Sequence, residues 1–237
     1  MAHYYTPNEE HGAYLFARFP SRGGTDVAVV SQSCVLNKKS AEIQRGRFLG
    51  IARKIYGKYT HGDHATPRYA KVNQYEPEMA LIVYLFENQK YARLFFNSDK
   101  RFKQPDFPPP SGMCEAWSVC RYYTPDYRDD NRTFMMSEVQ LQEGVRQEEY
   151  RERYCTPFAQ LLLDYDAHPY VVQANTVEDL RRYYLGADTI LTVHVFPTPE
   201  ELWKCIEDDR YIPLKAVHAT MASENLSVFT IDPKPCR

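Results

Sequence analysis

The chain has 237 residues, of which 43% are hydrophobic and 25% charged, a composition typical of a folded globular protein with a sizeable core. Its net charge of −2 at pH 7 and its lack of a long Lys/Arg run argue against nucleic acid and anionic membranes as partners. No run approaches the roughly 20 apolar residues of a membrane span, and residues 1–20 lack a signal-peptide pattern. A cytoplasmic protein is therefore expected.

Apolar alternation and helical spacing predict two successive sets of elements, each in the order strand, helix, strand, strand, helix, strand. Residues 1–25 precede the first set and are expected to form an N-terminal arm. In the first set, over 26–123, the predicted strands are 26–36, 67–75, 79–86 and 115–123, and the predicted helices are 39–57 and 88–98. The Pro-rich segment 103–112 must form a loop.

The second set covers residues 133–232, after a polar linker at 124–132 and before a tail at 233–237. Its predicted strands are 133–141, 168–174, 188–196 and 224–231, and its predicted helices are 146–165 and 198–209.

The two sets match each other in sequence. Residues 30–32 (VSQ) and 45–48 (RGRF) match 136–138 (MSE) and 151–154 (RERY) at an offset of 106, from 45 to 151. Residues 80–86 (ALIVYLF) match 190–196 (ILTVHVF) at an offset of 110, from 86 to 196. Such self-similarity indicates a tandem duplication, here of a ferredoxin-like βαββαβ unit in an α+β chain.

The second half, from residues 149–154 (EYRERY) through 192–198 (TVHVFPT), resembles the DUF1330 family of the dimeric α/β barrel superfamily, and the first half resembles a more distant copy. This resemblance implies that the antiparallel sheets of the two units pair into a barrel within one chain. Related branches include cofactor-free monooxygenases, polyketide cyclases, isomerases and haem enzymes, so the fold alone does not select a function.

Strand 188–196 suggests a site. Because side chains alternate along a strand, its aliphatic residues are expected to face the helices, which leaves Thr192, His194 and Phe196 facing the barrel interior. Glu138 on the neighbouring strand could share that face with His194 and form an acid–base pair. The alternative is that His194 is a hydrogen-bonded structural residue.

In the first half, Gln32 and Tyr84 occupy the positions of this pair and cannot perform the same chemistry, so any activity is expected in the second half. Arg121 could anchor an anionic ligand or pair with Glu115 or Asp126. The candidate catalytic residues are His194 and Glu138, and the candidate substrate-binding residues are Tyr84, Gln32, Thr192, Phe86, Phe196 and Arg121.

No cofactor or metal is predicted. His61 and His64, with Asp63 between them, have a spacing that could ligate a metal, but a polar turn is the alternative and no third ligand is assignable. Haem would need an axial ligand, and no feature selects His168, His194 or His218; a nucleotide loop is absent as well. The six cysteines contain no CxxC pair and are expected to be reduced thiols.

These features favour a small-molecule enzyme without a nucleotide cofactor that performs isomerisation, cyclisation or elimination on an aromatic or polyketide-like substrate. The chain is rich in tyrosine, with 19 residues, and tyrosine suits the wall of such a cavity. The alternatives are a non-catalytic protein that binds a hydrophobic ligand and a structural barrel that forms homo-oligomers.

Overall fold

The computed structural model of the chain describes residues 10–20, 38–60, 79–98, 115–122, 132–168, 171–173, 177–181 and 189–231. In the first half these form β1 (Glu10–Pro20), β2 (Gly46–Thr60), β3 (Met79–Phe86), α2 (Gln89–Ser98) and β4 (Glu115–Tyr122), with residues 38–43 helical. The second half begins with β5 (Thr133–Leu141), α3 (Gln147–Tyr150), η1 (Arg151–Cys155), α4 (Thr156–Leu163) and β6 (Val171–Gln173). It continues with β7 (Val177–Arg181), β8 (Thr189–Phe196), α5 (Pro199–Glu207), α6 (Tyr211–Met221) and β9 (Ala222–Ile231).

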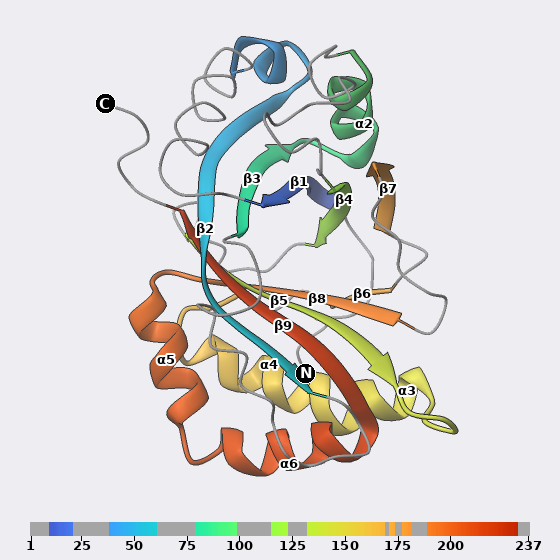
Figure 1. Ribbon diagram of the computed structural model, residues 1–237, viewed down its shortest axis with the longest axis vertical. Helices are drawn as coiled ribbons and strands as arrows, with labels where there is room; N and C mark the ends of the chain where they lie inside the picture. Colours follow the sequence, from blue (N-terminus) through green and yellow to red (C-terminus); the bar gives the residue numbers. More distant parts are fainter. Residues whose placement is uncertain are drawn as a thin grey trace.

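The described strands form one antiparallel sheet of order β6-β8-β5-β9-β2-β3-β1-β4-β7. The orders β4-β1-β3-β2 and β9-β5-β8-β6 are both the 4-1-3-2 arrangement of a ferredoxin-like unit. The halves join where β9 pairs with β2 and where β4 pairs with β7, a strand that follows β6 after only three residues. The predicted fold of two ferredoxin-like units with paired sheets is confirmed, and α4, α5 and α6 cover the outer side of the second half (Figure 1).

The first strand of the first half lies in the segment predicted as an arm. β1 pairs with both β3 and β4 in the middle of its half-sheet, and its residues 13–17 are buried on both faces. A strand covered on both sides reads as an unbroken apolar run, so the alternation expected of a half-buried strand is missing. The predicted strands 26–36 and 67–75 fall outside the described residues, as does all of the predicted linker 124–132 except residue 132.

The predicted helix at 39–57 is wrong. The helical segment ends at residue 43, Arg45 has a positive φ of 54°, and β2 begins at Gly46. The offset of 106 residues, which matched this segment to η1, is therefore wrong too. The offset of 110 is confirmed by register, because Phe86 lies opposite Ala13 on β1 and Phe196 lies opposite Thr133 on β5.

In the second half the elements lie close to the predicted ranges. Helix 146–165 is built from three consecutive segments, α3, η1 and α4, and helix 198–209 corresponds to α5. Helix α6 was not predicted; its Pro213 lies in the first turn, where a missing backbone N–H removes no helical hydrogen bond.

Side chains pack in three layers. The barrel interior holds residues from both halves, including Phe16, whose ring centroid lies 5.6 Å from that of Trp117 and 5.9 Å from that of Phe134. The other two layers lie between each half-sheet and its own helices. We call these the first and second helix-side layers.

Candidate functional site

The two faces of β8 are the reverse of the prediction. Leu191, Val193 and Val195 pack in the barrel interior with aliphatic residues of β3, whereas Phe196 packs in the second helix-side layer. The ring of His194 meets Phe158 of α4 edge to face, with centroids 5.3 Å apart. The inversion arises because both faces of the strand are buried, so an aliphatic face does not identify the helix side.

Tyr84 and Phe86 on β3 of the first half also face the helix side of their sheet. Their rings lie 4.9 and 5.2 Å from Phe95 of α2, in the first helix-side layer and not in the barrel interior. Of the other candidate residues, Gln32 and the side chain of Arg121 lie outside the described part of the chain.

Glu138 and His194 do not form the predicted acid–base pair, because the sheet separates them. Glu138 faces the barrel interior, where its Oε1 lies 3.2 Å from Nη1 of Arg18 and its Oε2 accepts a hydrogen bond from Asn225 at 3.1 Å. Arg18 also pairs with Glu115 at 2.7 Å and lies over the ring of Trp117, 5.4 Å from its centroid. This cluster joins the two halves across the barrel.

Four polar residues lie instead on the helix side of the second half, and we call them the polar track: Ser137, Thr192, His194 and Glu224. Ser137 on β5 lies opposite Thr192 on β8, and β9 on the other side of β5 carries Glu224. None of the four is more than 9% exposed. Buried polar groups are costly unless they are paired, so their neighbours decide their role.

Glu224 and Ser137 belong to a chain of polar side chains that reaches α3, with two hydrogen bonds and, between them, a 3.5 Å contact of Glu224 with His218. Ser137 Oγ donates to Glu224 Oε2 at 3.0 Å, and Nε2 of His218 on α6 lies 3.5 Å from the same oxygen. The other ring nitrogen of His218, Nδ1, lies 3.0 Å from the hydroxyl of Tyr150, which is fully buried. A carboxylate facing Nε2 favours the tautomer with its proton there, so Nδ1 accepts and Tyr150 donates.

Aromatic rings enclose this chain. Tyr154 lies on η1, a π-helical turn of the kind that occurs mostly as a local interruption of α-helices, often at functional sites. Its ring centroid is 4.6 Å from that of His218 and 5.4 Å from that of Tyr150. Burial is the main cause that raises the pKa of Tyr154 well above its usual value, so the Tyr154 phenol stays protonated.

His194 stays neutral because burial lowers its pKa to about 3. Its Nδ1 has no hydrogen-bond partner among the residues that the structure describes. Of the two predicted catalytic residues, only His194 lies in the second helix-side layer, which also holds the polar side chains from Tyr150 to Ser137.

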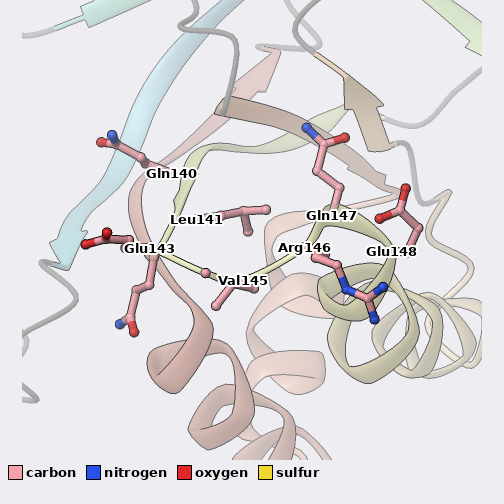
Figure 2. A pocket seen from close by; sticks show the side chains of 9 residues that line it. Gln140, Leu141, Glu143, Val145, Arg146, Gln147 and Glu148 are labelled. Atoms are coloured by element: carbon pink, nitrogen blue, oxygen red, sulfur yellow. The ribbon is translucent and has the colours of Figure 1, made fainter.

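A pocket of about 560 Å³ lies at the loop from β5 to α3 (Figure 2). This loop joins the strand of Ser137 to the helix of Tyr150, and the amide of Gln142 donates to Met221 at the end of α6 at 2.9 Å. The pocket is lined by Gln140, Leu141, Gln142, Glu143, Gly144, Val145, Arg146, Gln147 and Glu148. The elements that carry Ser137 and Tyr150, β5 and α3, thus contribute residues to the pocket, and the end of α6 is hydrogen-bonded to the lining residue Gln142.

The second helix-side layer does not fit a haem group. Both ring nitrogens of His218 face protein groups, and His194 packs against Phe158. Phe158 in turn contacts Tyr154 and Tyr211, with centroids 5.5 and 5.3 Å away. Neither histidine has an open plane beside it for a porphyrin.

Within the described ranges, no group of three or more His, Cys, Asp or Glu side chains could hold a metal ion. The predicted alternatives at His61 and His64 fall outside those ranges. No described helix is long and apolar enough to cross a membrane. Burial raises the pKa of the Cys155 and Cys205 thiols to about 12, so both remain protonated at neutral pH.

No family model matches the chain, and no curated protein sequence matches it, but solved structures of the same fold do. A candidate monooxygenase from Fusobacterium nucleatum is 10% identical with a TM-score of 0.54, over 94% of this chain and 93% of that chain. A candidate chlorite dismutase is 10% identical with a TM-score of 0.53, over 93% and 95%. A mutant chlorite dismutase from Candidatus Nitrospira defluvii is 8% identical with a TM-score of 0.50, over 95% and 93%. The chain thus has the fold of dimeric α/β barrels with two ferredoxin-like halves in one polypeptide.

Proposed function

We propose that this protein is a small-molecule enzyme without a nucleotide cofactor, and that it performs proton-transfer chemistry in the second helix-side layer. The observation that carries the proposal is the chain from Tyr150 through His218 and Glu224 to Ser137. It replaces the predicted pair of His194 and Glu138.

This series of polar side chains provides a base, His218, that can take a proton and return it. His218 accepts a proton from Tyr150, and the Glu224 carboxylate stabilises the imidazolium that results. Ser137 fixes that carboxylate by donating to it. We assign the exchange of a proton with substrate to Tyr150, because it lies on α3, whose residues Gln147 and Glu148 line the pocket. General acid–base catalysis of this kind contributes roughly 10²- to 10⁴-fold in rate.

The substrate class follows from the surroundings. The rings of Tyr154, Phe158 and Tyr211 pack together in this layer, and neutral His194 supplies a hydrogen-bonding group with an unused nitrogen. Such rings favour a planar aromatic or polyketide-like molecule as the partner. Among the proteins of similar fold, one is named as a candidate monooxygenase and others as chlorite dismutases, names that agree with a small-molecule reaction.

The test uses a panel of hydroxylated anthrones and naphthalenones, with binding measured by the shift in Tm and turnover by chromatography and oxygen uptake. Once a substrate is found, we expect His218→Gln to lower kcat by about 100-fold and Glu224→Gln by about 10-fold or more. Glu149→Gln is the matched control, because Glu149 lies one residue before Tyr150 but pairs with Arg153 at the surface. Wild-type turnover in folded His218→Gln would contradict the proposal.

Binding without turnover would support the alternative of a hydrophobic-ligand carrier that uses the same aromatic layer. The resemblance to DUF1330, the cytoplasmic location and homo-oligomer formation stay predictions.

A further inference from the structure

We infer that Tyr150 is a redox-active tyrosine, which an external one-electron oxidant converts to a neutral phenoxyl radical while its proton is kept on His218. The inference uses residues of the proposed site but requires no substrate, so it stands or falls separately from the proposed enzyme activity.

The geometry provides a destination for the proton. A phenol in a low-dielectric interior resists oxidation unless it loses its proton at the same time, because a cationic radical there would be strongly disfavoured. Tyr150 is 0% exposed, and its hydroxyl lies 3.0 Å from Nδ1 of His218. The O–H bond breaks as the electron leaves, the proton binds to Nδ1, and the imidazolium that forms faces the Glu224 carboxylate at 3.5 Å.

The geometry also provides a path for the electron. Successive ring centroids lie 5.4 Å apart from Tyr150 to Tyr154, 5.5 Å from Tyr154 to Phe158, and 5.3 Å from Phe158 to Tyr211. Tyr211, at the start of α6, is the last ring of this path and is 7% exposed. The oxidant is reduced by one electron, and rereduction of Tyr150 returns the proton from His218.

Tyr165 shows what this arrangement adds. Its hydroxyl donates to Asp208 at 2.7 Å, but hydrogen bonds from Arg210 and from Tyr165 itself hold the pKa of that carboxyl well below its usual range. A carboxylate with so low a pKa is a poor proton acceptor. Tyr165 thus has a hydrogen-bonded partner without an effective base, and it is the matched control for Tyr150.

The experiment mixes the full chain with hexachloroiridate(IV), freezes it after set times, and records electron paramagnetic resonance spectra. We expect a tyrosyl signal in the wild type that lives at least ten times longer than any signal in Tyr150→Phe. Tyr165→Phe should match the wild type within twofold, and His218→Gln should lower the yield at least tenfold. Equal signals in wild type and Tyr150→Phe would overturn the inference, as would loss of the signal in Tyr165→Phe.

A measurement on the wild type alone protects the test against variants that fail to fold. Electron–nuclear double resonance in H₂O and D₂O should reveal one strongly coupled exchangeable proton, the one shared by the phenoxyl oxygen and His218. A wild-type sample with no persistent radical, or with a radical that has no exchangeable coupling, would overturn the inference. Turnover of a substrate is not part of either readout, so failure of the proposed enzyme activity would be recognised separately.

Discussion

The two halves of the chain share a framework and differ on the helix side of their sheets. The register makes Ala17 equivalent to Ser137, Ile82 to Thr192, and Tyr84 to His194. The first half thus has two apolar side chains and a phenol where the second has a hydroxyl, a hydroxyl and an imidazole. Because burying polar groups costs stability unless they are paired, the second helix-side layer carries a cost that the first half avoids at two of these three positions.

In the barrel interior, by contrast, equivalent positions are complementary. Arg18 is equivalent to Glu138, and Glu115 is equivalent to Asn225, yet Arg18 pairs with both carboxylates and Asn225 binds Glu138. A symmetric dimer would place identical residues at these positions. The fusion of two halves allows an arginine and a glutamate to meet there instead.

The largest expected effect comes from removing the Glu224 carboxylate, which Ser137 and His218 share. Glu224→Ala leaves His218 and Ser137 buried without their shared partner, and we expect a loss of about 3–5 kcal/mol in the free energy of unfolding, measured with urea. Ser118→Ala is the contrast in the first half, because Ser118 Oγ is buried without a hydrogen-bond partner among the described residues. Its removal should cost nothing or stabilise slightly. Similar losses in both variants would remove the distinction between the layers.

The second effect is a pH dependence specific to the second half. Unfolded chains bind a proton at His194 below pH 6.5, whereas the folded state does so only near pH 3, because burial lowers the folded pKa. Protons therefore favour the unfolded state between these values. Stability should fall as the pH drops from 6.5 toward 3, by up to about 1.4 kcal/mol per pH unit from this residue.

His194→Phe tests this dependence, since phenylalanine keeps an aromatic ring against Phe158 and does not titrate. The difference in unfolding free energy between wild type and variant should shift steadily in favour of the variant below pH 6.5 and remain constant above it. A difference that does not vary between pH 4 and 7 would mean that His194 gains a proton in the folded state.

The sequence established the fold through the segment that repeats most plainly. Residues 80–86 and 190–196 are the third strands of two ferredoxin-like units, and alternation together with a fixed offset was enough to identify them. The expectation that any activity lies in the second half stays a prediction; in the first helix-side layer, Tyr84 occupies the position of His194.

Other parts were beyond sequence patterns for physical reasons. β1 is covered on both faces and so shows no alternation, which led to its assignment as an arm. The prediction assigned the two faces of β8 the wrong way round because both faces are apolar enough to be buried. Since neighbouring residues of β5 face opposite sides, this error placed His194 on the side of Glu138 and not on the side of Ser137. The chain of Tyr150, His218 and Glu224 unites residues of three elements, and one of them, α6, had not been predicted.

A smaller effect tests the contact between the halves. A double-mutant cycle of Arg18→Met and Glu138→Gln should give a coupling energy of about 1–2 kcal/mol, because both side chains are largely buried, at 18% and 22% exposure. The pair of Arg45 and Glu87, exposed at 61% and 54%, is the control within one half and should couple far more weakly. Equal coupling energies would mean that the barrel cluster contributes no more than a surface ion pair.

The smallest effect should be the same in both halves. Asn88 accepts a hydrogen bond from the amide of Tyr91 at the start of α2, and Thr198, 110 residues later, accepts one from Glu201 at the start of α5. Asn88→Ala and Thr198→Ala should each cost about 1 kcal/mol, and the double variant the sum, because the two caps share no partner. Thr198→Ser, which keeps the hydroxyl, controls for the loss of the methyl group. The two cap variants should lose equal and additive amounts of unfolding free energy, whereas the Glu224 and Ser118 variants should lose unequal amounts. That outcome would show that the duplication preserved the helix starts while the helix-side layers diverged. Unequal costs at the caps would mean that the divergence extends to the framework itself.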